Sequence, residues 1–408
     1  MQRTLITLCA LLFLSGVIRA SLSATSQSLH DSVSVALITC HPGDQVYELE
    51  GHTALRIILP DGTDMTVNWG LFDFNSPNFL YRFVKGETDY RMGAAPTQHF
   101  LTQYAREGRR VDQTPLNLTP RERDRLVSLI DSTFRIGSPV YRYNYVLDNC
   151  ATRPLDYIAM AIGAPVQLTD TTALAHRAGN TFRSDMTAFH SNYPWYQFGI
   201  DLALGSLIDR PLAPGQHAFA PVSLAVMLQG SLRPAPDDPS HLIPLAGATT
   251  TLLPDNGGGP DGPTPWFLTP LAVCSLFAII TLAISLHDLR RRVISRWFDT
   301  IYFSIMGLAG LLLTFLIFIS VHYATSPNWL FLWLNPLCFI GATLIWIKKC
   351  RKVVILYQIV NFAAIVALCV AAICGAQVLN IAFVPLLVAD AARAAVYIRS
   401  AKWHSATI

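Results

Sequence analysis

Residues 266–287 read WFLTPLAVCSLFAIITLAISLH, a run that contains no Lys, Arg, Asp or Glu. About 20 apolar residues in a helix are enough to cross the hydrocarbon core of a bilayer. Four more apolar runs of similar length follow. The predicted spans are residues 266–287, 301–322, 329–347, 353–374 and 377–398. These runs predict an α-helical membrane bundle of about five spans at the C-terminal end of the chain.

The rest of the chain has the composition of a soluble domain. Only 14% of the 408 residues are charged, against roughly 25% in soluble proteins, and many of the charges lie within residues 21–245. A segment of that length can bury a full hydrophobic core without a metal or a disulfide. The net charge of +3 is too small to favour a nucleic-acid partner. The sequence also shows no metal-ligand cluster and no Gly-rich phosphate loop, so we predict no metal and no cofactor.

Two signals place the soluble domain outside the cytoplasm. Residues 1–20 have Arg3 before an apolar run and small residues near Ala20, which favours a cleaved signal peptide over an uncleaved anchor. Alternate connections between the spans are basic, and the positive-inside rule places such connections in the cytoplasm. The basic residues are Arg290, Arg291, Arg292 and Arg296, then Lys348, Lys349, Arg351 and Lys352, and finally Arg399 and Lys402 in the tail, residues 399–408. We therefore expect a multi-pass protein of a bacterial inner membrane, with a periplasmic domain and a cytoplasmic C-terminus.

Two further features of the sequence are the composition of the segment that joins the two domains and an acidic residue in the last predicted span. Residues 246–265 are rich in Thr, Gly, Pro and Asp, a composition typical of a flexible linker. Asp390 lies inside the fifth span, where an ionisable group is costly and often functional. Arg393 follows one turn later, and we favour the interpretation that the two side chains simply pair.

Cys150 is the candidate nucleophile of the soluble domain. It follows Asp148 and Asn149, which are typical helix-capping residues, and precedes an apolar-periodic run that predicts a helix. A thiol in the first turn of a helix has its pKa lowered by the helix dipole, and free N–H groups nearby can hold an oxyanion. The alternative is a disulfide with Cys40, since an exported domain permits one. We favour a buried, free Cys40, because a bridge would remove the nucleophile.

His52 is the candidate general base. It lies in the strand-like run GHTALRIIL at residues 51–59, and a Pro-Asp-Gly turn leads from there into a second strand-like run. The resulting hairpin brings Asn68 back towards His52, where an amide can orient the imidazole. Asp73 competes for the same role. A histidine on a strand is more often structural, and only its combination with Cys150 favours catalysis.

Further motifs accompany these residues. They are CHPGD at 40–44, EGHTALR at 50–56, NWGLFDF at 68–74, DNCATR at 148–153, TFR at 181–183, PW at 194–195 and FGIDLALG at 198–205, ahead of Asp209. Together they resemble the periplasmic domain of the lipoprotein N-acyltransferases of certain Gram-negative bacteria, over about residues 33–225. That family is similar in catalytic logic to permuted papain-like folds of the lecithin:retinol acyltransferase type. The resemblance implies an α+β papain-like (permuted) cysteine-nucleophile domain ahead of the membrane bundle.

The resemblance also implies a two-step acyl transfer. Cys150 would attack an ester of a membrane phospholipid, giving a thioester and a lysophospholipid. The acyl group would then pass to the α-amino group of the lipidated N-terminal cysteine of a diacylated lipoprotein. His52, oriented by Asn68, would deprotonate Cys150 and then the acceptor amine. Independently, a thiol site anchored near the outer leaflet favours a lipid as the substrate.

Two other functions use the same residues. A membrane-tethered hydrolase or peptidase of cell-wall peptides needs the same Cys–His pair and differs only in the acceptor. In a non-enzymatic envelope scaffold, Cys150 would be structural. Arg153 can contact a lipid headgroup, although an ion-paired or solvated helix residue is the more common case. The sequence does not specify an oligomeric state.

Overall fold

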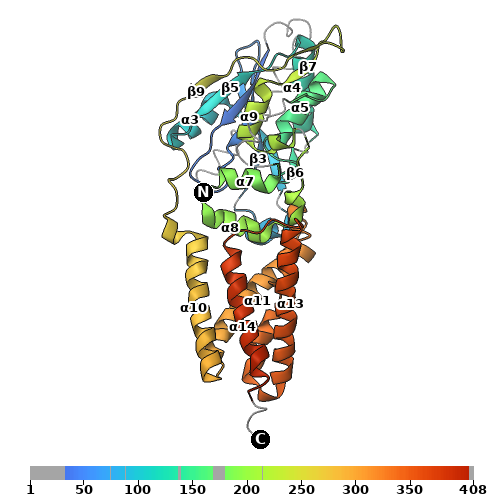
Figure 1. Ribbon diagram of the computed structural model, residues 1–408. Coiled ribbons are helices and arrows are strands. Elements are labelled where there is room, and N and C mark those ends of the chain that lie inside the picture. The colour runs from blue at the N-terminus through green and yellow to red at the C-terminus, as the bar shows by residue number, and fades with distance from the viewer. Residues whose placement is uncertain are drawn as a thin grey trace.

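The computed structural model consists of an N-terminal α+β domain that stands on a helical bundle (Figure 1). It describes residues 33–73, 75–87, 89–136, 139–168, 180–213 and 215–403. The predicted signal peptide, residues 1–20, and the end of the predicted tail, residues 404–408, lie outside these ranges. The α+β character predicted for the first domain is confirmed, while its relation to papain-like folds stays a prediction.

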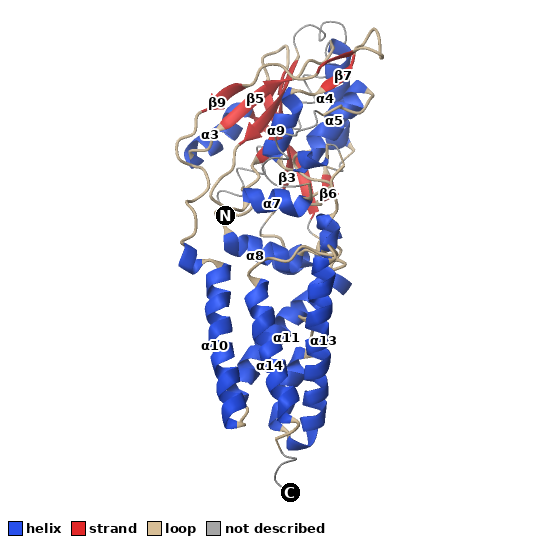
Figure 2. Cartoon of the chain, viewed as in Figure 1, coloured by secondary structure: helices blue, strands red, loops and turns tan. Residues whose placement is uncertain are grey.

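A seven-stranded antiparallel sheet forms the centre of the N-terminal domain (Figure 2). The strands lie in the order β6-β4-β3-β2-β1-β5-β9. Their bounds are β1 Ser34–Cys40, β2 His52–Ile58, β3 Asp64–Leu71, β4 Asp89–Pro96, β5 Val111–Pro115, β6 Val140–Arg142 and β9 Thr250–Leu253. A second, two-stranded sheet pairs β7 Leu232–Pro234 with β8 Leu242–Pro244. The predicted hairpin is present, since β2 pairs with β3 and Ala54 lies opposite Asn68.

Helices cover both faces of the large sheet. The helices of the N-terminal domain are α2 Phe79–Lys85, α3 Thr97–Glu107, α4 Pro120–Arg135, α5 Thr152–Ile162, α7 Phe182–Phe189, α8 Pro194–Ala203 and α9 Pro221–Gln229, with the 3₁₀ helices η1 Ser206–Asp209 and η2 Gln216–Phe219. The main core lies between the sheet and α4, α5 and α9, where Trp69 of β3 contacts Tyr157 of α5 with ring centroids 5.1 Å apart. On the other face, Phe100 and Tyr104 of α3 pack with Ile38 of β1. The sheet is therefore a rigid support for residues at the ends of β2 and β3.

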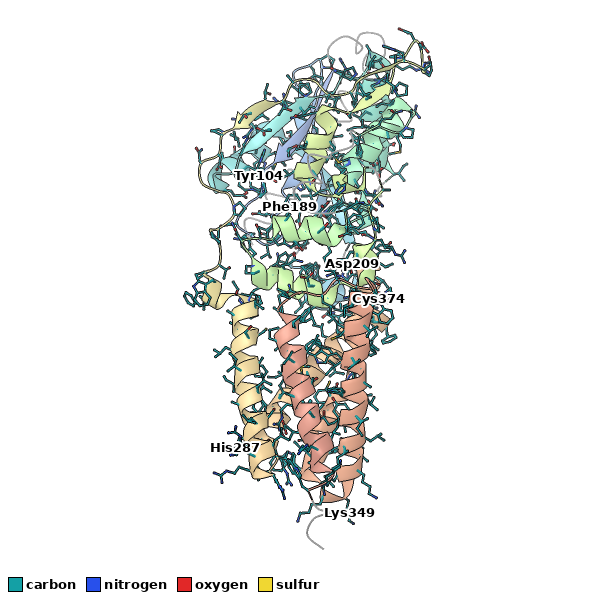
Figure 3. All side chains as sticks on the ribbon, viewed as in Figure 1. Tyr104, Phe189, Asp209, His287, Lys349 and Cys374 are labelled. Atoms are coloured by element: carbon teal, nitrogen blue, oxygen red, sulfur yellow. The ribbon has the colours of Figure 1, made fainter. Side chains whose placement is uncertain are left out.

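Three helices of the bundle are long and apolar enough to cross a membrane. They are α10 Pro270–Arg291, α11 Arg296–Phe318 and α13 Arg351–Ile373, the last extended by the 3₁₀ turn η7 Lys348–Cys350. A further helix, α14 Phe383–Ser400, packs against α10 and α13. Figure 3 shows His287 and Lys349 at the end of the bundle far from the N-terminal domain, and Cys374 at the near end. The basic first and third connections thus lie opposite the N-terminal domain, in agreement with the charge pattern.

The predicted span 329–347 is wrong as a continuous helix. This segment is divided into η5 Trp329–Leu332, the short helix α12 Cys338–Thr343 and η6 Leu344–Trp346. Pro336 lies between η5 and α12, where it has no N–H to donate and interrupts a helix. The backbone of Asn335 packs so closely on Gly310 of α11 that a Cβ at this glycine would lie 2.4 Å from it. The segment is therefore packed into the bundle by an irregular backbone that hydropathy does not reveal.

Asp390 and Arg393 do not pair, so the predicted ion pair between them is wrong. Arg393 binds Asp299 of α11 at 2.7 and 2.8 Å and Asp288 of α10 at 3.0 Å. Asp390 accepts hydrogen bonds from two other side chains, Trp333 at 2.8 Å and Asn361 at 3.1 Å. All of these polar groups are buried. The partners come from different helices, so only the packing of the bundle decides which side chains meet.

The N-terminal domain docks directly on the bundle. Helix α8 lies across the ends of the bundle helices (Figure 1), and Phe198 of α8 contacts Phe383 of α14 with ring centroids 4.8 Å apart. The backbone N–H of Gly205 donates to the carbonyl of Ala324 at 2.7 Å. The predicted fifth span, residues 377–398, is helical only from Phe383, because its first residues bind the N-terminal domain instead.

A buried arginine organises this junction. Arg183 of α7 donates to Asp201 at 2.7 Å and to Asp209 at 2.6 Å. The same two carboxylates accept from the segment before α14, Asp201 from Asn380 Nδ2 at 2.8 Å and Asp209 from the Val378 N–H at 3.2 Å. Figure 3 places Asp209 at the boundary between the two parts of the molecule. One ion-pair network therefore joins the two domains.

The predicted linker, residues 246–265, is not a free tether. Thr250–Leu253 forms β9, the edge strand that pairs with β5, because β-branched and apolar residues suit a half-buried strand. Further along, the Asp261 N–H donates to the Tyr193 hydroxyl at 2.8 Å. The chain is thus held against the N-terminal domain on its way to α10.

Candidate active site

His52 and Asn68 meet as predicted from the hairpin. His52 Nε2 and Asn68 Oδ1 are 2.9 Å apart. An amide oxygen only accepts, so Nε2 carries the proton and Nδ1 keeps the free lone pair of the neutral ring. The competing orienter, Asp73, accepts instead from the backbone N–H of Asn75 at 2.9 Å in a local turn. Asn68 is therefore the residue that fixes the tautomer of His52.

Cys150 lies against the start of this hairpin. The backbone N–H of Thr53, the residue after His52, donates to its sulfur. Gly70 of β3, with φ +91°, lies on the other side, where a Cβ would be 3.6 Å from the Cβ of Cys150. Gly51, with φ +81°, directly precedes β2 and lies so close to the Cys40 carbonyl that a Cβ would be 2.4 Å from that oxygen. Two glycines thus allow the close approach of backbone that this site needs.

Cys150 precedes its helix rather than lying in it. Helix α5 begins at Thr152, and Asn149 Oδ1 accepts from the N–H groups of Ala151 at 2.8 Å and Thr152 at 3.0 Å. The predicted capping role of Asn149 is confirmed by these two bonds. The same bonds occupy the free N–H groups that we expected to stabilise a thiolate.

The predicted low pKa of Cys150 is therefore wrong. Burial raises the pKa of the Cys150 thiol to about 11, although hydrogen bonds from Tyr143 and from the Thr53 N–H act in the opposite direction. Burial also lowers the pKa of His52 to about 4, against the hydrogen bond with Asn68, which raises it. At neutral pH the resting site holds a thiol and a neutral imidazole. A base must remove the thiol proton during the attack itself.

The pKa of the Cys150 thiol predicts how Cys150 reacts with iodoacetamide. We expect the alkylation rate to rise about tenfold per pH unit from pH 6 to 10, because only about one thiol in 10⁴ is ionised at pH 7 when the pKa is about 11. Mass spectrometry of the Cys150 peptide over this pH range measures the rate, with the exposed Cys374 as internal control for the reagent. A plateau reached below pH 8 would contradict the prediction.

Tyr143 is a site residue that sequence reasoning missed. Its hydroxyl lies 4.0 Å from the Cys150 sulfur, and its ring stacks on Tyr90 with centroids 4.3 Å apart. A tight turn brings it there, in which Asn144 and Asp148 exchange backbone hydrogen bonds. The sequence does not show that the chain folds back and places Tyr143 beside Cys150. The turn-forming Asn144, one residue after the tyrosine, is consistent with such a turn.

Glu50 is a second missed residue. Its carboxylate accepts hydrogen bonds from the Tyr145 hydroxyl and from His190 Nε2, the latter at 2.8 Å. The other nitrogen of His190 bonds Gln197 at 2.7 Å, and Gln197 donates to Asp201 at 2.9 Å. A buried polar chain thus runs from two residues before His52 to the junction with the bundle. The only sequence signal was the position of Glu50 within the Glu-Gly-His motif.

The remaining predicted site residues support the turn around Cys150. Asp148 binds Arg153 through a two-bond ion pair, one bond of which measures 2.7 Å. The Arg153 guanidinium also lies 3.8 Å from the centroid of the Tyr141 ring. Cys40 is a buried free thiol, as predicted, and Cys150 is also free and buried. The ion-paired interpretation of Arg153 is therefore confirmed.

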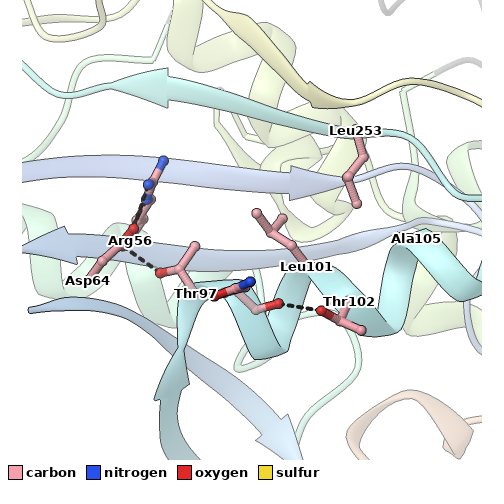
Figure 4. Close-up of a pocket in the computed structure, with 8 residues that line it drawn as sticks. Arg56, Asp64, Thr97, Leu101, Thr102, Ala105 and Leu253 are labelled. Carbon is pink, nitrogen blue, oxygen red and sulfur yellow. Dashed lines mark hydrogen bonds and ion pairs between the residues drawn. The ribbon is translucent and has the colours of Figure 1, made fainter.

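A depression beside α3 lies away from these residues. Arg56, Asp64 and Thr97 form part of its lining (Figure 4). Asp64 accepts from Arg56 Nε at 2.9 Å and from Thr97 Oγ1 at 2.6 Å, so its polar groups are already partnered. Within the described ranges, no group of three or more His, Cys, Asp or Glu side chains is arranged to hold a metal ion.

The comparisons with known proteins cover both domains. Residues 21–182 match the model of the Lnb N-terminal periplasmic domain, and residues 263–403 match that of the Lnb transmembrane domain. No curated protein and no solved structure has a significant match. The protein is therefore a membrane protein with a periplasmic N-terminal domain, and it belongs to the Lnb family. The predicted periplasmic position of the first domain and the transmembrane character of the second are confirmed.

Proposed function

We propose that this protein transfers a fatty acyl chain from a membrane phospholipid, through a thioester on Cys150, to the α-amino group of the lipidated N-terminal cysteine of lipoproteins. The observation that carries the proposal is the position of Cys150 against the backbone of Thr53, the residue that follows His52, whose imidazole Asn68 orients. The domain that holds these residues docks directly on a membrane bundle. We further propose a bacterial inner membrane as its location, with the basic end of the bundle in the cytoplasm.

The first half-reaction uses the thiol and His52. His52 Nδ1 takes the Cys150 proton as the sulfur attacks the ester carbonyl. The N–H of Thr53 already points at the sulfur, and it is one of the donors available to the developing oxyanion, together with the Tyr143 hydroxyl. When the intermediate collapses, the ester C–O bond breaks, and the imidazolium returns its proton to the departing lysophospholipid alkoxide.

The second half-reaction needs no further group. The acceptor α-amine attacks the thioester carbonyl, a C–N bond forms and the C–S bond breaks. His52 accepts a proton from the amine, and the thiolate of Cys150 is protonated again. Both halves balance without an oxidant, a reductant or a nucleotide. The pKa of about 4 keeps His52 unprotonated throughout the physiological pH range. It also makes the imidazole a weak base, so the proton must move as the sulfur attacks.

The position of the domain favours a lipid substrate over a soluble peptide. The N–H of Val321, just after α11, donates to the Lys85 carbonyl of α2 at 2.8 Å. The Trp195 indole of α8 donates to the Leu268 carbonyl at 2.7 Å, immediately before α10. Two helices of the catalytic domain are thus held at the ends of membrane helices, where acyl lipids are abundant.

The test uses a reporter lipoprotein in cells that lack their own N-acyltransferase. Mass spectrometry of its N-terminal peptide should show an amide-linked acyl group with the wild-type chain and a free amine with Cys150→Ala, because the alanine cannot form the thioester. Cys40→Ala, which removes the other thiol of the same domain, is the matched control and should retain acylation.

A free amine in cells that hold the wild-type chain in the membrane would overturn the proposal. Release of cell-wall peptides by the wild type, and not by Cys150→Ala, would then assign the site to a hydrolase. Full wild-type phenotype of Cys150→Ala would instead assign it to a scaffold.

A further inference from the structure

A row of aromatic side chains leads away from the Cys150 sulfur. Tyr143 lies next to the sulfur and stacks on Tyr90 with centroids 4.3 Å apart. Tyr90 contacts Phe72 at 4.9 Å, measured between ring centroids. Phe72 follows β3 directly and stacks on Phe79, the first residue of α2, at 5.8 Å. Three strands or strand ends thus contribute to one continuous aromatic surface.

The other end of the row lies at the membrane bundle. Phe79 stacks on Phe83 at 5.8 Å, and the Phe83 ring contacts His322 beyond the end of α11 at 6.3 Å. His322 Nε2 also donates to the Phe83 carbonyl at 2.7 Å. On the same helix, Tyr81 contacts Phe315 within α11 at 6.0 Å. The row therefore connects the outer end of a membrane helix with the nucleophile.

The membrane end of this row, at Phe72 and α2, does not form part of a closed core, whereas Tyr90 and Tyr143 pack against the main core of the domain. Helix α2 has no buried residue, and its apolar side chains Leu80, Tyr81 and Phe83 are 72%, 54% and 45% exposed. Phe72 and Phe79 are also partly exposed. Contiguous exposed apolar surface of this kind marks a site for a ligand, a partner or a membrane. The two basic residues of the same helix are ion-paired, Lys85 with Glu87 at 2.7 Å and Arg82 with Asp89 at 3.1 Å, so the exposed surface of α2 is mainly apolar.

We propose that this aromatic row, Tyr143, Tyr90, Phe72, Phe79 and Phe83, binds the fatty acyl chain of the donor lipid. The inference rests on the proposed function, since the acyl carbonyl must reach the Cys150 sulfur. The methylene tail then lies along the row, and its end stays near the membrane at α2. Because the rings stack on one another, the row offers the chain their apolar edges and the faces that stacking leaves uncovered, with no directional hydrogen bond to satisfy.

The proposal predicts that the rate of Cys150 acylation depends on the length of the lipid's acyl chain. The full chain is reconstituted in vesicles with phosphatidylcholines carrying eight-, twelve- or sixteen-carbon acyl chains, and acylation of Cys150 is followed by mass spectrometry. A soluble four-carbon ester, p-nitrophenyl butyrate, measures the reactivity of the Cys150 thiol, because its acyl group is too short to extend along the row. Each methylene in contact with the row should raise the rate by at most about fourfold, the value for transfer from water, because the chain leaves a bilayer that is itself apolar.

Phe79→Ala should lower acylation by the sixteen-carbon lipid about tenfold, and leave the reaction with the butyrate ester unchanged. Phe79→Leu should recover most of the loss, because it restores apolar volume. Met160→Ala, which trims an exposed apolar side chain on the outer face of α5, is the matched control and should behave like the wild type.

The outcomes separate the two proposals. Equal chain-length dependence in the wild type and Phe79→Ala, with Cys150 acylated in both, would overturn the acyl-binding role of the row alone. Absence of any acyl group on Cys150 of the wild type, with every lipid and with the butyrate ester, would overturn the proposed function on which it rests.

Discussion

His52→Ala is expected to lower the rate of acyl transfer at pH 7 by about 10²–10⁴-fold. The 10⁴-fold limit corresponds to the fraction of Cys150 that is ionised at pH 7, about one thiol in 10⁴ when the pKa is about 11. Without its base, the variant depends on spontaneous ionisation of the thiol. Its rate should therefore rise about tenfold per pH unit between pH 7 and 9, while that of the wild type stays nearly constant. If the rates of the wild type and of His52→Ala depend on pH in the same way, His52 is not the base.

The partner of His52 provides the control for this prediction. Asn68→Asp keeps an acceptor for the Nε2–H, and its negative charge should raise the pKa of His52 from about 4. Because His52 acts as a neutral base, the fall of activity on the acid side should then occur at higher pH. Asp73→Asn changes a carboxylate that binds only its local turn, and should leave the profile unchanged.

Arg183→Met is expected to destabilise the protein by about 3–5 kcal/mol, because it leaves the carboxylates of Asp201 and Asp209 buried without their cation. The Arg183 side chain is 3% exposed and those of the two aspartates 6% and 5%, so water cannot replace it. The same carboxylates bind the segment before α14. We expect a clear fall in the apparent melting temperature of the full chain in detergent, together with earlier proteolysis at the junction.

An exposed arginine is the matched control for Arg183. Arg135→Met removes an i, i+4 pair with Asp131 whose arginine side chain is 63% exposed, and such pairs contribute at most about 1 kcal/mol. Arg183→Lys keeps the charge without the planar fork and should give an intermediate loss. An Arg183→Met variant that melts with the wild type would show that the network does not hold the domains together.

Local features of the chain were predictable where the determining interactions are themselves local. The apolar runs 266–287 and 301–322 correspond to α10 and α11 within a few residues, because a backbone in lipid must satisfy its own hydrogen bonds by forming a helix. The contact of His52 with Asn68 followed from hairpin pairing. Even so, the break at Pro336 was overlooked, although a proline in a helical run is a visible signal.

The pKa of Cys150 and the partners of the buried charges were not predictable from local features of the chain. The sequence suggested a thiolate stabilised by a helix, but Asn149 takes the N–H groups and burial raises the pKa of Cys150. Burial depends on which distant segments cover the sulfur. The pairing of Arg393 with Asp288 and Asp299 has the same origin, since both partners come from other helices.

The sequence by itself determined the two-domain plan, the long membrane helices α10, α11 and α13, the β2–β3 hairpin and the identity of Cys150, His52 and Asn68 as candidates. Composition and short-range pairing act over a few residues and are therefore visible in the sequence. Only the tertiary structure decided the anchoring of the 246–265 segment, the junction at Arg183 and the aromatic row from Cys150 to α2. These features join residues far apart in the chain, and the partner of a buried group is set by the packing of whole elements rather than by its neighbours in sequence.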